Sequence, residues 1–276
     1  MTSNKQFTWA KSKAEDWKNY LPPTRPSASE LTVIEKYLLK LTNSKPKKIF
    51  KLAILGCTIE YRNLAHKYGT DVTLIDISKL HYKILSKQPM SYKGAEKFLA
   101  MDWRKMKTKE KFDLILGDLV VNMLNTKDRD ILLKNVSGML ATNGIFISRN
   151  WIKPSNLPPN FAAVVKLVRK KYPNTNFYTS TAGFVYPAYI NNTEFADVKK
   201  LKADLKSLKE KKLITNSEHK YWHDRLRYEI KGVSTPSLKP LNQQFFKYFK
   251  LISIKEGIDI YSDKFKIHFL KKHNST

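Results

Sequence analysis

Cysteine is almost absent from this sequence, since Cys57 is the single one among 276 residues. One cysteine excludes an intrachain disulfide and a zinc site built from several cysteines. The sequence also lacks an apolar run of the roughly 18 residues that a membrane-spanning helix requires, and its opening stretch has no apolar signal-peptide core. We therefore expect a cytoplasmic protein with no metal site and no membrane contact.

Acidic residues and arginine are both scarce. The chain has 24 acidic and 51 basic residues, which gives a formal net charge of +27. The electrostatic field of so large a positive charge attracts nucleic acid. Only eight of the basic residues are arginine, however, and arginine is the side chain whose planar fork binds phosphate and guanine in a bidentate way. The lysines are scattered along the whole chain, as the codons of an A/T-rich genome would produce. The charge therefore leaves a nucleic-acid substrate open without requiring one.

Glycine is rare in the loop that follows an early apolar segment, "KLAILGCTIE" (residues 51–60). In a dinucleotide-binding loop a second glycine admits the pyrophosphate and a third permits close helix packing. Here Gly56 stands alone, with Thr58 and Glu60 at the other two positions. Gly56 can still make a sharp turn, because glycine tolerates positive φ. The loop therefore argues against NAD and favours a ligand that carries no phosphate.

Around this loop, short apolar strands alternate with amphipathic helices. A first helix is predicted over 27–41, where Ser27 and Glu30 form a capping-box pattern. The alternation that follows predicts a parallel sheet with helices on both faces. Two closely spaced strands at the end of the chain predict an antiparallel hairpin. The predicted strands cover 50–56, 71–76, 97–102, 112–118, 145–149, 247–257 and 264–272, and a turn is predicted over 141–144.

The order of these elements resembles that of the class I S-adenosylmethionine-dependent methyltransferases. The resemblance covers residues 48–150 and 246–276. It rests on "LAILGCTIE", "LIDIS" with Asp76 ending strand two, "AMDW" with Asp102 ending strand three, "LILGD" ending strand four and "MLATNGIFISR" entering strand five. It implies an α/β fold with a Rossmann-like, doubly wound sheet. That sheet would be mostly parallel with an antiparallel last strand, and a helical insertion would lie between strands five and six.

The resemblance also implies a cofactor, S-adenosylmethionine, at the carboxyl ends of the strands, where open α/β sheets bind ligands. Asp76 would accept hydrogen bonds from the ribose hydroxyls, Asp102 would meet the adenine amino group, and Trp103 would flank the adenine ring. An N-terminal helix closes over the cofactor in many such enzymes, and the aromatic stretch around Trp17 is the candidate here. The predicted cofactor-binding residues are Gly56, Cys57, Thr58, Asp76, Ile77, Asp102, Trp103, Asp118, Arg25 and Tyr20.

The methyl acceptor is less clearly indicated. The segment "LGDLVVNML" lacks the Asn/Asp-Pro-Pro-Tyr/Phe motif of enzymes that methylate adenine N6 or glutamine. Asp118 and Asn122 follow strand four and are placed to face the methyl donor. Arg149 ends strand five, where it would clamp a carboxylate or phosphate or form a surface salt bridge. His219 and His223 share a helix face, without a third zinc ligand, so either is a candidate base. The catalytic candidates are Asp118, Arg149 and His223.

We predict an N-terminal helical lid (1–47), a methyltransferase core (48–150 and 246–276) and a mainly helical insertion (151–245) that roofs the acceptor pocket. The favoured function is methyl transfer to a small molecule. One alternative is an RNA methyltransferase that uses the basic surface, with Tyr221 and Trp222 available to stack on bases. The other is a non-catalytic module that binds S-adenosylmethionine. The sequence names neither the acceptor nor the oligomeric state.

Overall fold

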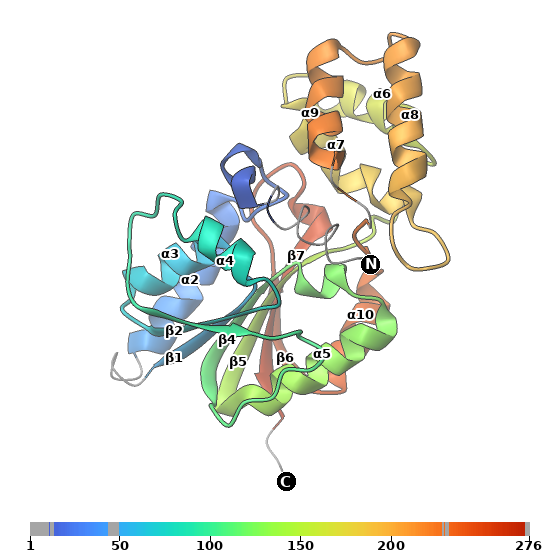
Figure 1. Ribbon diagram of the computed structural model, residues 1–276. Coiled ribbons are helices and arrows are strands. Elements are labelled where there is room, and N and C mark those ends of the chain that lie inside the picture. The colour runs from blue at the N-terminus through green and yellow to red at the C-terminus, as the bar shows by residue number, and fades with distance from the viewer. Residues whose placement is uncertain (1–10, 12–13, 44–49, 228, 230–231, 274–276) are drawn as a thin grey trace.

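The structure, a computed structural model, describes residues 11, 14–43, 50–227, 229 and 232–273. Its centre is one seven-stranded sheet with the strand order β3-β2-β1-β4-β5-β7-β6 (Figure 1). Strand β7 pairs antiparallel with both of its neighbours, whereas the pairs on the other side of β5 are parallel. The predicted mostly parallel sheet with an antiparallel last strand is therefore confirmed. The strands are β1 (Lys51–Leu55), β2 (Asp71–Asp76), β3 (Glu96–Ala100), β4 (Phe112–Asp118), β5 (Leu140–Trp151), β6 (Phe249–Lys255) and β7 (Phe265–Lys272).

Helices cover both faces of this sheet. On one face, α2 (Ala28–Asn43) and α3 (Ile59–Lys67) pack their apolar side chains onto β1, β2 and β4. On the other face, α5 (Thr126–Met139) and α10 (Leu238–Phe246) form a second core with the same strands. The short helix α4 (Lys79–Leu85) follows β2. The central strands read as continuous apolar runs because both of their faces are buried.

Four helices between β5 and α10 form a separate bundle, visible in orange and yellow in Figure 1. They bury an apolar cluster of their own around Trp222, and Trp151 at the end of β5 joins that cluster. The lysine-rich segment after Val198 is an amphipathic helix, since its leucines are buried and all its lysines except the half-buried Lys202 are exposed. The helices are α6 (Phe161–Lys171), α7 (Phe177–Val185), α8 (Val198–Glu210) and α9 (Asn216–Leu226), with the short turn η4 (Pro187–Tyr189) between α7 and α8.

The N-terminal segment runs between this bundle and the sheet. It contains the short helix η1 (Trp17–Asn19). The Leu21 N–H donates to the Tyr221 hydroxyl at 3.4 Å, and the Thr179 hydroxyl donates to the Pro22 carbonyl at 3.2 Å. The predicted capping box at the start of α2 is confirmed by reciprocal hydrogen bonds between Ser27 and Glu30. The part of the lid region before residue 11, residues 12–13 and residues 44–47 lie outside the described residues.

Two local expectations were wrong. Residues 141–144 were predicted to be a turn before strand five, but they belong to β5. The pairing register shifts there between Phe112 and Leu114, and Asn143 has a φ of +67°, so the strand continues through an irregularity. Strand β3 ends at Ala100, which places Asp102 in the loop that follows. Among the described residues, no helix is both long and apolar enough to cross a bilayer.

Candidate functional site

Gly56 forms the turn between β1 and α3. Its φ of +94° lies in the region that glycine adopts readily and other residues do not. Its N–H donates to the Ile75 carbonyl of β2 at 2.8 Å. A Cβ placed on Gly56 would lie 3.8 Å from the Trp103 ring and 3.9 Å from the Asp76 carboxylate. The loop therefore brings three of the predicted cofactor-binding residues to one point at the carboxyl ends of the strands.

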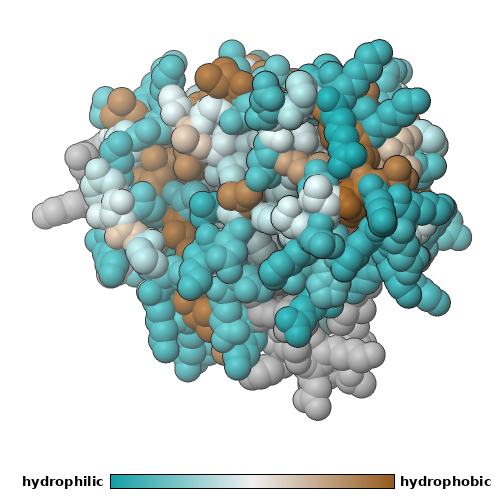
Figure 2. Space-filling model, turned by 90° about the horizontal axis from the view of Figure 1, so that it is seen from above, coloured by the Kyte–Doolittle hydropathy of each residue, from teal (hydrophilic) through white to brown (hydrophobic). Residues whose placement is uncertain are grey.

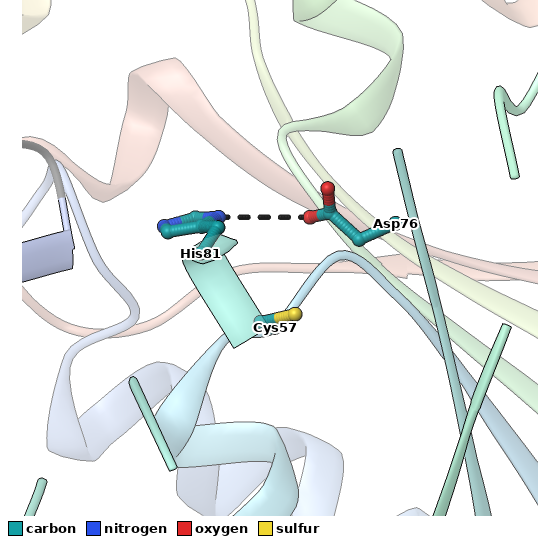
Figure 3. Close-up of side chains that lie close together, drawn as sticks. All are labelled: Cys57, Asp76 and His81. Atoms are coloured by element: carbon teal, nitrogen blue, oxygen red, sulfur yellow. Dashed lines mark ion pairs between the residues drawn. The ribbon is translucent and has the colours of Figure 1, made fainter. Parts of the chain in front are cut away.

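The Asp76 carboxylate ends β2 and is buried. Its Oδ1 accepts a hydrogen bond from the Ser78 N–H at 2.8 Å, which fixes the side chain in a local turn. Its Oδ2 lies 3.6 Å from His81 Nδ1, beyond hydrogen-bond distance (Figure 3). Ser78 itself caps α4, because its hydroxyl accepts from the His81 N–H. Asp76 therefore does not cap the helix, and one of its oxygens is available to a ligand.

The residues beside this aspartate differ in exposure. Cys57 is a free, buried cysteine, and burial raises the pKa of its thiol. Thr58 is buried at the N-cap position of α3, where its side chain makes no capping hydrogen bond. Ile77 is 56% exposed and is the outermost of the group.

The loop after β3 carries two predicted adenine contacts with different surroundings. The indole N–H of Trp103 donates to the Ile75 carbonyl at 2.8 Å, which holds the ring beside Gly56. The Asp102 carboxylate, in contrast, is engaged by the Arg104 guanidinium through contacts of 3.0 and 2.5 Å. That pairing lowers the pKa of Asp102. A ligand would have to share Asp102 with this arginine.

The N-terminal segment reaches the glycine loop through Arg25. Arg25 Nη1 lies 3.4 Å from Glu60, the residue at the third-glycine position. Burial raises the pKa of Glu60. Trp17 also packs against the apolar cluster that contains Cys57. Tyr20 lies elsewhere, since its ring faces the Arg225 guanidinium of α9 at 5.2 Å. The structure therefore places Arg25 at the loop and Tyr20 against the insertion.

Arg149 stands at the centre of a fully buried ionic network. Its Nε donates to Glu30 at 2.7 Å, its Nη1 to Asp118 at 3.0 Å and its Nη2 to the Pro23 carbonyl at 2.9 Å. Its guanidinium also lies 4.7 Å from the centre of the Phe265 ring. Burial raises the pKa of Asp118 to about 6, although Arg149 opposes the shift. Arg149 therefore joins the N-terminal segment to β4 and β5, and the expected clamp on a substrate anion does not match this placement.

Two further candidates are not placed to contact a ligand: the Asn122 amide is fully hydrogen-bonded to backbone groups, and His223 lies away from the strand ends. Asn122 is buried, and its amide bonds the Trp151 backbone and the Ser234 carbonyl. Its amide therefore links the end of β5 to the segment before α10. His223 is an exposed side chain on α9, beside His219 and Asp224. Its position in the bundle offers no contact with the glycine loop.

Two hollows lie near the insertion. One, of about 400 Å³, is lined by Asp16, Asn19 and Tyr20 of the N-terminal segment and by Tyr221 and Arg225 of α9. The other, of about 500 Å³, lies where α5 and α10 begin and is lined in part by Arg129 and Thr235. Asp16 and Asn19, which line the first hollow, flank Trp17 in the chain, and Trp17 packs against the apolar cluster that contains Cys57.

No family model matches the sequence, and no curated protein is detectably similar to it. Solved structures do match. Magnesium protoporphyrin IX methyltransferase from Synechocystis PCC 6803, with bound S-adenosylhomocysteine, has a TM-score of 0.55 at 9% identity over 99% of this chain and 100% of that one. A methyltransferase from Methanosarcina mazei has a TM-score of 0.52 at 15% identity over 86% and 98% of the two chains. The 1,6-didemethyltoxoflavin-N1-methyltransferase of Burkholderia thailandensis scores 0.52 at 8% identity over 98% and 86%.

The chain has the class I methyltransferase fold. Within this fold the structure brings Gly56, Cys57, Asp76 and Trp103 together, with Arg25 nearby. Three contacts near these residues were not predicted from the sequence. His81 lies opposite Asp76, Glu60 lies beside Arg25, and Glu30 accepts a hydrogen bond from Arg149. Glu30 had a signal, since it was recognised as a capping residue, but nothing in the sequence pointed to its second role.

Proposed function

We propose that the protein transfers a methyl group from S-adenosylmethionine to a small-molecule acceptor. The observation that carries this proposal is the convergence of Gly56, Asp76 and Trp103 at the carboxyl ends of β1, β2 and β3. Open α/β sheets bind ligands at this edge. Two of the solved structures that share the fold hold S-adenosylhomocysteine.

The residues present fit the cofactor. Asp76 Oδ2 faces the Gly56 turn and lies 3.6 Å from His81 Nδ1, and this oxygen would accept from the ribose hydroxyls. Gly56 makes the turn with a positive φ that residues with a side chain rarely adopt, and it leaves the space between Trp103 and Asp76 without a Cβ. The Trp103 ring, held by its hydrogen bond to Ile75, would flank the adenine. When bound, the cofactor supplies the electrophilic methyl group.

We place the acceptor in the hollow between the N-terminal segment and α9. Its walls carry both acids and bases, including Asp16 and Arg225, which suits a polar acceptor with ionic groups. The methyl-transfer step needs alignment and exclusion of water more than a strong base. Of the catalytic candidates, Asp118 and Arg149 engage each other at the strand ends, so we assign both of them positioning roles.

The RNA alternative loses one of its two candidate stacking residues. Trp222 is fully buried, and its indole N–H donates to the Thr181 hydroxyl at 3.1 Å. It cannot stack on a base. Figure 2 shows hydrophilic side chains over most of one face, with separate apolar patches between them. Exposed lysines occur on α4, on the β3–β4 loop, on α8 and on β6, so the described basic residues are spread over several elements.

The test is calorimetric titration with S-adenosylhomocysteine, which binds without turnover. Replacing Asp76 with Ala removes charge-assisted hydrogen bonds worth about 1.5–3 kcal/mol, so affinity should fall roughly ten- to hundredfold. Asp76→Asn keeps the acceptor for the Ser78 N–H and separates loss of charge from loss of the turn. Asp71→Ala, at the exposed opposite end of β2, is the matched control and should bind normally. Absence of binding to the wild-type protein would refute the proposal.

A further inference from the structure

Three side chains with metal-binding atoms meet beside the glycine loop. They come from three elements: Cys57 follows β1, Asp76 ends β2 and His81 lies in the first turn of α4. One atom from each, a sulfur, an oxygen and a nitrogen, lies within 4.8 Å of the other two. Figure 3 shows the imidazole and the carboxylate facing each other, with the thiol beside the line that joins them. Chain distances of 19 and 5 residues gave no spacing signal for this cluster.

The local backbone holds the three residues in register. The Gly56 N–H donates to the Ile75 carbonyl, which ties the residue before Cys57 to the residue before Asp76. The Ser78 N–H donates to Asp76 Oδ1, and this bond orients the opposite oxygen towards His81. Such an outer hydrogen bond is the usual support of a metal-binding carboxylate. Main-chain hydrogen bonds therefore hold the three side chains close together before any cation binds.

The spacing is close to what a tetrahedral ion needs. Zinc bonds to sulfur, nitrogen and oxygen at about 2.0–2.3 Å, so ligand atoms of one ion lie roughly 3.3–3.8 Å apart. The carboxylate–imidazole distance of 3.6 Å already falls there. The remaining contraction is on the order of 1 Å, which side-chain rotation can supply. No described residue bonds the buried His81 Nε2, so rotation of the ring breaks no hydrogen bond at that atom.

We propose that Cys57, Asp76 and His81 bind one zinc-class divalent cation, with a fourth coordination position open to solvent or ligand. A ligand set of thiolate, imidazole and carboxylate is the one that Zn²⁺ accepts. Binding forms a metal–sulfur bond and releases the Cys57 thiol proton to solvent, because the thiolate is the ligating form. No oxidation or reduction is involved.

The site has a consequence for the cofactor, and this part rests on the proposed function. Asp76 cannot hold a cation and the ribose hydroxyls with the same oxygen. Metal and cofactor should therefore exclude each other, and the effect must be reciprocal: each should weaken the other by the same factor. The site would make cofactor binding sensitive to free zinc.

The experiment uses Co²⁺ with chelator-treated, tag-free full-length protein. Cobalt bound to a thiolate absorbs in the near ultraviolet, so the signal reports the Cys57 sulfur directly. We expect a saturable band with one cobalt per chain, which Zn²⁺ displaces. Cys57→Ser, a change of one atom, should abolish the band, and His81→Ala should weaken cobalt binding at least tenfold. His219→Ala removes a helix-surface histidine outside the cluster and should leave the band unchanged.

The outcomes separate the two proposals. No band in the wild-type protein, or a band that survives Cys57→Ser, overturns the metal site. A cobalt band in a protein that does not bind S-adenosylhomocysteine keeps the metal site and refutes the proposed function. If the protein binds each ligand separately, S-adenosylhomocysteine should raise the apparent cobalt dissociation constant linearly with its own free concentration, without a plateau. Simultaneous binding without that shift would show that Asp76 is not shared.

Discussion

Replacing Arg149 with methionine tests the buried network that joins the N-terminal segment to the sheet. The side chain is fully buried and donates to two carboxylates and one carbonyl. Methionine fills similar space but leaves Glu30 and Asp118 buried without a counter-charge. Removing one partner of a buried ion pair costs about 3–5 kcal/mol, because the remaining charge is uncompensated. Arg149→Met should lower the free energy of unfolding by that amount.

The assay is urea unfolding at pH 7, evaluated by linear extrapolation. Arg104→Met is the matched control, since Arg104 also pairs with two carboxylates but is 44% exposed. It should cost no more than about 1 kcal/mol. The double variant Glu30→Gln/Arg149→Met should be more stable than Arg149→Met, because it leaves one buried charge fewer. A loss of less than about 1 kcal/mol in Arg149→Met, or no recovery in the double variant, would refute this account of the network.

Three further predictions follow from single residues. Gly56→Ala forces a side chain into a φ of +94° and should cost more than about 1 kcal/mol of stability while also weakening S-adenosylhomocysteine, measured by urea unfolding and calorimetry. The pKa of Asp118 is raised from 3.8 to about 6, so its contribution to stability is fully present below pH 3.8 and is lost as pH rises through about 6; Asp118→Asn should flatten the stability–pH curve in that window. Trp222→Ala should lower the free energy of unfolding by about 3–5 kcal/mol. Trp222→Phe should stay folded, and in filter assays its binding to generic RNA should be weak and steeply salt-dependent, as for the wild-type protein. Tight RNA binding by the wild-type protein that Trp222→Phe abolishes would contradict the small-molecule proposal.

The sheet could be predicted from the sequence because its signals are local. Apolar runs such as 112–118 are bounded by turns and alternate with helical segments, and the antiparallel end follows from two strands joined by a short loop. Gly56, Asp76 and Trp103 were also predictable, because each ends a strand or lies within three residues of a strand end on the same edge of the sheet.

The partners of these residues were not predictable, because they are set by packing between distant segments. Arg149 bonds Glu30 and Pro23, which precede it by 119 and 126 residues. Trp222 looked like an exposed aromatic among charged neighbours, but the bundle buries it, since α9 turns that side towards α6 and α7. Asn122 lies in a short helix whose direction no local pattern fixes.

The start of α2 is fastened to the far end of the chain. The hydroxyls of Ser27 and Ser29 both donate to Asp259 at 2.6 Å. A ribosome adds about 5–20 residues per second, so residue 259 is made on the order of 10–50 s after residue 27 at that rate. During synthesis the N-terminal segment therefore lacks its Asp259 partner while the strands between residues 51 and 151 leave the ribosome. Folding therefore cannot be completed in order from the N-terminus. The hydrogen bonds at the start of α2 form only after the β6–β7 hairpin, whose loop carries Asp259, has been synthesised.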